Sequence, residues 1–121
     1  MTTTQPIGPL DLRDMGQSPT ARLFEGAKHA GIGISIFVVA TPPGGLVGLH
    51  THPYSETFVL LEGRGRWTAG DVVVELGSEQ LLVVPPHTLH GFRNVGDTPL
   101  VLFSVHESGT LDQTFIGADP A

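Results

Sequence analysis

The feature that most constrains the fold is a regular recurrence of turn signals. From residue 22 to residue 116, short segments rich in β-branched and aromatic residues alternate with turns that contain glycine or proline. The turns recur at intervals of about ten residues, which is typical of a β-sandwich or a β-barrel. Sixteen glycines and ten prolines among the 121 residues supply these turns. No segment shows a convincing apolar period of about 3.6 residues, so the pattern favours an all-β fold.

The strands expected from this pattern are short, and most end at a glycine or a proline. They lie in residues 33–40, 56–63, 66–76 (two segments around a turn at 69–71), 79–86, 89–94, 100–105 and 113–116. Residues 1–20 hold several threonines and prolines, which predicts an extended N-terminal arm that is only partly ordered. Residues 21–121 are then expected to form one barrel domain, because a chain of this length leaves no room for a second.

Charge and composition exclude several classes of function. The formal net charge is −6 with only six lysines and arginines, so the chain lacks the cationic surface that nucleic acids or anionic membranes require. Without any cysteine it has no disulfide, no thiolate zinc site and no cysteine nucleophile. The first residues do not resemble a secretory signal, and the apolar runs are too short to cross a bilayer. We therefore expect a soluble, cytoplasmic protein.

Three histidines and a glutamate are spaced as metal ligands would be. Side chains two residues apart in a strand share a face, so His50 and His52 are expected to point the same way. Glu56 faces the same interior if the turn at Pro53 preserves the orientation of the chain. His90 begins a strand, and pairing with a neighbouring strand is expected to bring it close to His50 and His52. Three imidazoles and one carboxylate, without sulfur, suit a first-row transition metal better than Mg²⁺ or Ca²⁺.

Apolar and cationic residues near these ligands are candidates for a substrate pocket. Phe58 and Leu60 share a strand face with Glu56, and Phe92 shares one with His90, so we expect these three to line the pocket. Arg64 and Arg66 lie on one face after a glycine turn. Either arginine is a candidate to bind a substrate carboxylate, although arginines at such positions are more often solvated.

Other histidines and one tyrosine have weaker claims to function. His87 follows two prolines and would place an additional imidazole near the pocket mouth, or would be a surface turn residue. Tyr54 is a candidate for the pocket rim, with packing or surface exposure as the alternative. His87 and Tyr54 are the candidate catalytic residues. His29 and His106 are interpreted as ordinary core or surface histidines, because a lone histidine in a strand is rarely a ligand.

The chain resembles the cupin superfamily over residues 22–105. Its first motif is matched, with every interval correct, by Gly44, His50, His52, Glu56 and Gly63. The second motif is matched by three residues, Pro85, His90 and Asn94. That motif departs from the family pattern at Glu79-Gln80, where a Gly-Asp pair is usual, and at His87, where a glycine is usual. Both departures fall at turns and concern loop shape more than metal ligation.

The resemblance implies a fold, a ligand set and a class of function. The fold would be a double-stranded β-helix, a jelly-roll-like barrel with the site inside. The metal ligands would be His50, His52, Glu56 and His90, and they would hold one divalent transition ion, Fe or Mn first, with Ni, Co, Cu or Zn as alternatives. The partners would be a small-molecule substrate and a second copy of the chain, in a homodimer formed by exchange of N-terminal strands.

Four protein ligands on an octahedral ion leave two adjacent positions free, which permits chemistry. The resemblance therefore implies a metal-dependent enzyme, with a dioxygenase-type oxygenase acting on a small enolic or aromatic molecule as the leading hypothesis. One alternative is a cyclase or isomerase that uses the ion without O₂. Another is a cupin that binds a small ligand and catalyses nothing.

Overall fold

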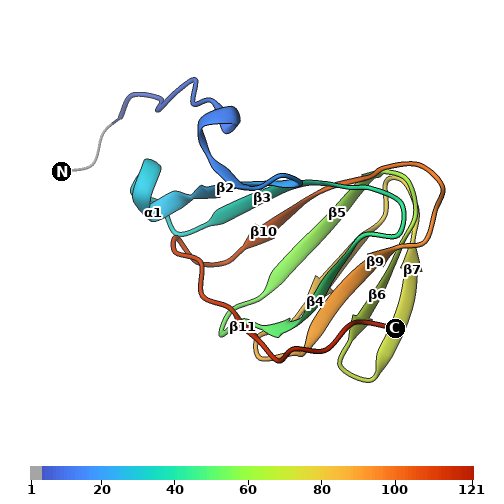
Figure 1. The fold of residues 1–121 in the computed structure, drawn as a ribbon. Coiled ribbons are helices and arrows are strands. Elements are labelled where there is room, and N and C mark those ends of the chain that lie inside the picture. The colour runs from blue at the N-terminus through green and yellow to red at the C-terminus, as the bar shows by residue number, and fades with distance from the viewer. Residues whose placement is uncertain (1–3) are drawn as a thin grey trace.

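Two antiparallel sheets form the body of the protein (Figure 1). The computed structural model describes residues 4–121. One sheet has six strands in the order β1-β2-β3-β10-β5-β8, and the other has five in the order β11-β4-β9-β6-β7. The strands are β1 Gly16–Ser18, β2 Ala21–Glu25, β3 Ser35–Thr41, β4 Leu46–Thr51, β5 Glu56–Glu62, β6 Gly65–Ala69, β7 Val72–Leu76, β8 Leu81–Val84, β9 His90–Asn94, β10 Leu100–His106 and β11 Thr114–Phe115. The predicted all-β barrel of the double-stranded β-helix type is confirmed.

Alternation along the strands decides which side chains enter the barrel. In β10, the residues with even numbers are buried and those with odd numbers are partly exposed. β5 follows the same rule in its first half, where Glu56, Phe58 and Leu60 are buried. β10 lies between β3 and β5 and pairs with both along most of its length. These central strands therefore present one inward row each, as a period of two requires.

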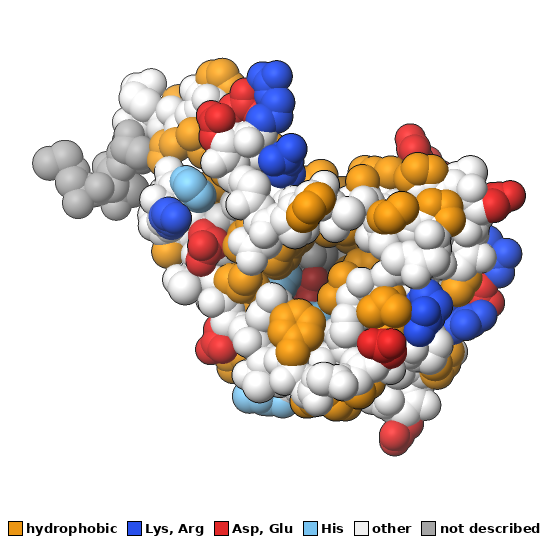
Figure 2. Space-filling view, viewed as in Figure 1, with side chains coloured by type: hydrophobic (Ala, Val, Ile, Leu, Met, Phe, Trp, Pro, Cys, Tyr) orange, Lys and Arg blue, Asp and Glu red, His pale blue; other side chains and the backbone are white. Residues whose placement is uncertain are grey.

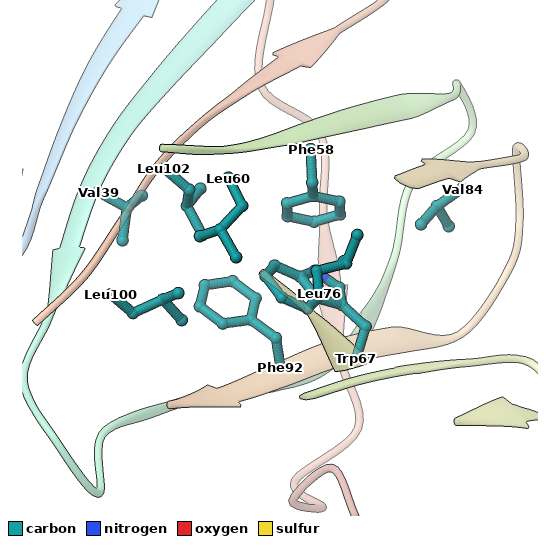
Figure 3. Close-up of a cluster of buried hydrophobic side chains, with 9 residues drawn as sticks. All are labelled: Val39, Phe58, Leu60, Trp67, Leu76, Val84, Phe92, Leu100 and Leu102. Atoms are coloured by element: carbon teal, nitrogen blue, oxygen red, sulfur yellow. The ribbon is translucent and has the colours of Figure 1, made fainter. Parts of the chain in front are cut away.

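A hydrophobic core lies between the two sheets (Figure 3). The Trp67 indole is fully buried and stacks on Phe92, with 5.0 Å between the ring centroids. Phe58 meets both rings edge to face. The other members of this core are Val39, Leu60, Leu76, Val84, Leu100 and Leu102. Both sheets contribute to the core, so its burial holds them together.

Most expected strands form, and their ends shift for local reasons. The strand expected over residues 79–86 is reduced to β8, because Glu79 has a positive φ of 66° and the following prolines lack an N–H. The strand expected at 33–40 is β3, two residues later at its start. The short helix α1 (Gly26–His29) was not expected, since four residues are too few to show a helical period.

The N-terminal segment contributes secondary structure of its own. A short 3₁₀ helix, η1, spans Leu12–Asp14, and β1 pairs with β2 at the edge of the six-stranded sheet. Residues 16–18, within the expected arm, therefore extend the sheet. Residues 1–3 of that arm lie outside the described residues. Exchange of this segment between two chains stays a prediction. Among residues 4–121, no helix has the length and apolar character needed to span a bilayer.

Candidate metal centre

Pairing between strands gathers five ionisable side chains at one end of the barrel. His50, near the end of β4, lies opposite His90, the first residue of β9. Glu56 begins β5 and lies opposite His106, the last residue of β10. His52 follows β4 directly. The positions are far apart in sequence, and the register of two antiparallel pairs brings them together.

Four of these side chains form a compact set of potential ligands. The ligand atoms of His50, His52, Glu56 and His90 all lie within 4.8 Å of one another. Nε2 of His52 and Nε2 of His90 each lie 3.0 Å from Oε1 of Glu56. All four residues are at most 5% exposed. These are the four residues singled out from the sequence, and the fold places them together.

Backbone carbonyls fix the orientation of the three imidazoles in this set. Each ring places its Nδ1 within hydrogen-bond distance of a carbonyl oxygen. The pairs are His50 with Gly48 at 2.7 Å, His52 with Asp112 at 2.9 Å, and His90 with Thr88 at 2.8 Å. A carbonyl can only accept, so Nδ1 carries the proton and the Nε2 lone pair of each neutral ring is left free. This is the usual arrangement for metal-ligating histidines.

Electrostatics at the centre fit a cation. Burial lowers the pKa of His50 to about 4, so this imidazole is neutral near neutral pH. Burial acts to raise the pKa of Glu56, but its contacts with His106, His52 and His90 outweigh burial and hold that pKa well below its usual value. An ionised carboxylate therefore faces three imidazole nitrogens at a distance of 3.0 Å. A divalent transition ion satisfies all four groups, and the donor set fits one.

His106 is a fifth member of the cluster and is a buried core histidine, one of the two alternatives expected for it, but its place beside Glu56 was not expected. Its Nε2 lies 3.0 Å from Oε2 of Glu56, and its Nδ1 lies 2.9 Å from the Tyr54 hydroxyl. The residue is 1% exposed, so the surface alternative is wrong and the core alternative holds. A signal was present in the sequence: Leu100, Leu102 and His106 lie in one inward row, where an imidazole requires a polar partner.

An open cavity of about 140 Å³ reaches this cluster. Among the charged and imidazole groups of the cluster, His50, Glu56 and His106 line it, whereas His52 and His90 do not. Four phenylalanines contribute to its apolar wall, and they are Phe37, Phe58, Phe92 and Phe115. Figure 2 shows a hollow on this face, with carboxylate and histidine atoms visible inside it and apolar side chains around it. The cluster is therefore accessible to a small molecule.

All three apolar residues expected in a pocket belong to the hydrophobic core, and two of them also line the cavity. Phe58 and Phe92 line the cavity. Leu60 shares their inward face, but it is 1% exposed, belongs to the hydrophobic core and is absent from the cavity lining. It lies two residues beyond Phe58 on the same inward face of β5.

The two arginines expected near the substrate lie elsewhere. Arg64 is exposed in the turn between β5 and β6 and pairs with Glu75. Arg66 alternates with the buried Trp67 on β6, so its side chain points away from the barrel interior. Neither arginine lines the cavity. Glu56 is at the first end of β5, and the turn that carries Arg64 follows its last residue, Glu62. The spacing of the motif residues alone does not reveal this separation.

The two candidate catalytic residues also lie outside the cavity lining. The His87 side chain is exposed, its φ is 62°, and its backbone N–H donates to the His52 carbonyl over 2.7 Å. The Tyr54 ring is buried and stacks on His52, with ring centroids 4.9 Å apart. Tyr54 therefore packs against the cluster without lining the cavity, whereas only the backbone N–H of His87 contacts the cluster.

Comparison with known families identifies the fold and the motif region. The family described as Cupin domain matches residues 37–106, which include all five residues of the cluster. Among curated proteins, "Polyketide synthase CurC" of Streptomyces cyaneus is 38% identical over 73 residues, which are 60% of this chain and 45% of that protein. "Protein SchB" of Streptomyces halstedii is 39% identical over 61 residues, or 50% of this chain and 44% of that protein. The chain thus matches less than half the length of these two relatives.

Solved structures share the architecture at low sequence identity. Bacillus subtilis oxalate decarboxylase, studied for its Mn(II) centres, aligns with a TM-score of 0.75 and 20% identity over 83% of this chain and 29% of that one. A Klebsiella pneumoniae protein with a double-stranded β-helix domain aligns with a TM-score of 0.64 and 24% identity, covering 69% of this chain and 74% of that one. These likenesses concern the fold alone.

Proposed function

Since the chain belongs to the cupin family, we propose that it is a metal-dependent enzyme, a dioxygenase-type oxygenase acting on a small enolic or aromatic molecule. The observation that carries the proposal is the convergence of His50, His52, Glu56 and His90 beside an apolar cavity. A purely structural metal site is usually closed. Here two of the four ligands line a space that a substrate can enter.

The four ligands would hold one divalent transition ion, with Fe or Mn as the first candidates. When bound, such an ion supplies a Lewis acid for an enolate or phenolate oxygen, and as iron it also supplies a centre for reaction with O₂. The chain's own residues fix the ligands before the ion arrives. His50, His52 and His90 are held by backbone carbonyls, so little reorganisation is needed on binding.

The cavity favours a substrate that is neutral apart from the group near the ion. No lysine or arginine belongs to the cavity lining in the described part of the chain. A second carboxylate in this space would lack a lysine or arginine partner and would be costly to desolvate. A cavity of about 150 Å³ is known to hold one benzene ring, and this one is about 140 Å³. We therefore expect one ring or its enolic equivalent inside, with any remainder projecting through the mouth.

Oxygen consumption tests the oxygenase directly. The purified protein, reconstituted with Fe(II), would be screened in an oxygen electrode against enolic and phenolic compounds. We expect O₂ uptake that depends on metal, substrate and an intact Glu56. The Glu56→Gln variant would be inactive, whereas His87→Asn, which replaces an exposed histidine and tolerates its positive φ, would serve as the matched control. Metal-loaded protein without substrate-dependent O₂ uptake would count against the oxygenase.

A Lewis-acid cyclase or isomerase is the second candidate function. The observation that favours it is the likeness to a protein named polyketide synthase, since polyketides are rich in enolisable carbonyl groups. The ion would polarise such a carbonyl, and the phenylalanine wall would hold the ring. Substrate turnover under strictly anaerobic conditions would support this function over the oxygenase. A ligand that binds and is recovered unchanged in both conditions would indicate a binding protein.

The same proposal includes a homodimer built around the N-terminal segment. β1 lies at one edge of the six-stranded sheet, with its three residues exposed. An exposed edge is a template for another strand, which a second copy would supply. Light scattering coupled to size-exclusion chromatography of the full chain measures this. A single species at the monomer mass, at micromolar concentration, would contradict it.

A further inference from the structure

The Tyr54 hydroxyl determines which nitrogen of His106 carries the proton. The backbone N–H of Asp112 donates to this hydroxyl over 3.2 Å, so the oxygen already serves as an acceptor there. Nδ1 of His106 lies 2.9 Å from the same oxygen. A buried hydroxyl donates its own proton where it can, and among the described contacts Nδ1 is the acceptor within reach. Nδ1 of His106 is therefore the unprotonated nitrogen, and Nε2 carries the proton.

This tautomer is the opposite of the one found in the three potential ligands. In His50, His52 and His90 the proton is on Nδ1, and the Nε2 lone pair faces the centre. In His106 the Nε2–H group faces the centre, 3.0 Å from Oε2 of Glu56. The N–H is not well aligned for a hydrogen bond, but no other partner lies near it in the described chain. An imidazole that presents its proton to the centre has no Nε2 lone pair for a metal ion, and the carboxylate oxygen is the acceptor nearest to that proton.

The two carboxylate oxygens of Glu56 thus face different neighbours. Oε1 lies against Nε2 of His52 and Nε2 of His90, at 3.0 Å from each, where an ion would bind. Oε2 lies against His106. A carboxylate free to rotate would be able to offer both oxygens to one ion and would fill a position that a substrate needs. A donor that holds Oε2 prevents this rotation.

We propose that His106, oriented by Tyr54, is a positioning residue that holds Oε2 of Glu56, so that Glu56 binds the metal through Oε1 alone. The inference rests on the metal site of the proposed function, but it does not depend on the reaction. It assigns a role to His106 and Tyr54, two buried residues that contact the four potential ligands without belonging to that set. It also explains why a histidine in β10 lines a cavity that is otherwise largely apolar.

Nitrogen NMR of the zinc-loaded protein reads the tautomers directly, since Zn(II) is diamagnetic. With ¹⁵N-labelled histidine, long-range proton–nitrogen correlations report which ring nitrogen carries a proton. We expect protonated Nδ1 in His50, His52 and His90, and unprotonated Nδ1 in His106. The assignment is made by single substitution of each histidine. A proton on Nδ1 of His106 would overturn the proposed orientation.

Metal titration of three variants tests the consequence. His106→Leu removes the donor, and we expect Mn(II) affinity to fall about 10- to 100-fold, the usual range for a lost outer partner of a ligand. His106→Gln keeps an N–H donor at a similar position and should lie closer to the parent protein. Tyr54→Phe removes one hydroxyl and should weaken binding about fivefold. The Mn(II) EPR spectrum should change in His106→Leu, because the carboxylate is then free to bind through both oxygens.

The controls separate this inference from the proposed function. His87→Asn should keep both the affinity and the EPR spectrum of the parent protein. Circular dichroism of each metal-free variant shows whether it folds, and Tyr54→Phe remains informative if His106→Leu does not. Parent protein that binds no metal would contradict the proposed function. Parent protein that binds Mn(II), with His106→Leu identical to it in affinity and spectrum, would contradict only the role of His106.

Discussion

The two ends of the barrel interior are built by the same strands and yet have opposite chemistry. β5 begins with Glu56 in the cluster and enters the apolar core at Phe58 and Leu60. β10 runs the other way, from Leu100 in the core to His106 in the cluster. In each strand, the inward residues are charged or polar at the end near the cluster and apolar toward the other end. One end therefore stabilises the fold, while the other gathers buried polar groups at ligand spacing beside the cavity.

Breaking the apolar end should have the largest effect on stability and little effect on the site. Trp67→Ala removes a fully buried indole, and we expect the free energy of unfolding to fall by about 3–5 kcal/mol. Urea titration of the metal-free protein measures it. Val72→Ala, an exposed position in the next strand, is the matched control and should change the value by less than about 0.5 kcal/mol. A loss below about 1 kcal/mol for Trp67→Ala would contradict the assignment of the core.

Filling the polar end with metal should stabilise the protein by the next largest amount. At a free-metal concentration of about 100 times Kd, binding to the folded state adds about 2.7 kcal/mol to the free energy of unfolding. We expect His52→Ala to lose this gain, because it removes one of the four ligands. Unfolding with and without metal, for both proteins, gives the comparison. An equal gain in His52→Ala would show that the metal binds elsewhere.

Acid should destabilise the polar end of the metal-free protein. The pKa of His50 is lowered from 6.5 to about 4 in the folded state, so below pH 6.5 the unfolded chain binds more protons. Stability due to neutral His50 is complete above pH 6.5 and is lost as the pH falls toward 4, by about 2 kcal/mol between pH 7.5 and pH 5. The lowered pKa of Glu56 adds a further loss below about pH 4.5, with the same sign.

Urea unfolding in the presence of a chelator, repeated across this pH range, measures the loss. His50→Asn cannot titrate, yet its amide can still donate to the Gly48 carbonyl as Nδ1 does. This variant should therefore show a flatter dependence of stability on pH. The same slope in the parent protein and in His50→Asn would assign the acid sensitivity to other groups.

Changing a residue outside both regions should have the smallest effect. Arg64 and Glu75 form an exposed ion pair on the side of the barrel away from the cluster, and such pairs contribute about 0–1 kcal/mol. We expect Arg64→Ala to alter stability within that range and to leave metal affinity unchanged. Isothermal titration with Mn(II) checks the second point. A tenfold loss of Mn(II) affinity in Arg64→Ala would show that Arg64 takes part in the metal site.

Much of the polar end could be predicted from the sequence because ligand spacing is a local signal. His50 and His52 share a face by the period of a strand, and Glu56 follows after one turn. His90 is also predictable, because Pro85 and Pro86 fix the direction of the chain just before its strand begins. The architecture followed similarly from turn spacing, so the fold and the four-residue set were both within reach of the sequence.

The remainder depends on which strands become neighbours, which the spacing of residues does not contain. His106 joins the cluster because β10 pairs with β5 in a register that places it opposite Glu56. Arg64 lies away from the cluster because it follows the last residue of β5, whereas Glu56 is the first residue of that strand.

Metal analysis of the purified protein tests the central claim most directly. After reconstitution with Mn(II) and removal of free metal, elemental analysis gives the number of ions per chain for the parent protein, His52→Ala and His87→Asn. The account predicts one tightly held ion in the parent protein and in His87→Asn, and none in His52→Ala. A parent protein that remains without metal, or a His52→Ala variant that retains a full complement, would contradict the claim that His50, His52, Glu56 and His90 form a metal centre.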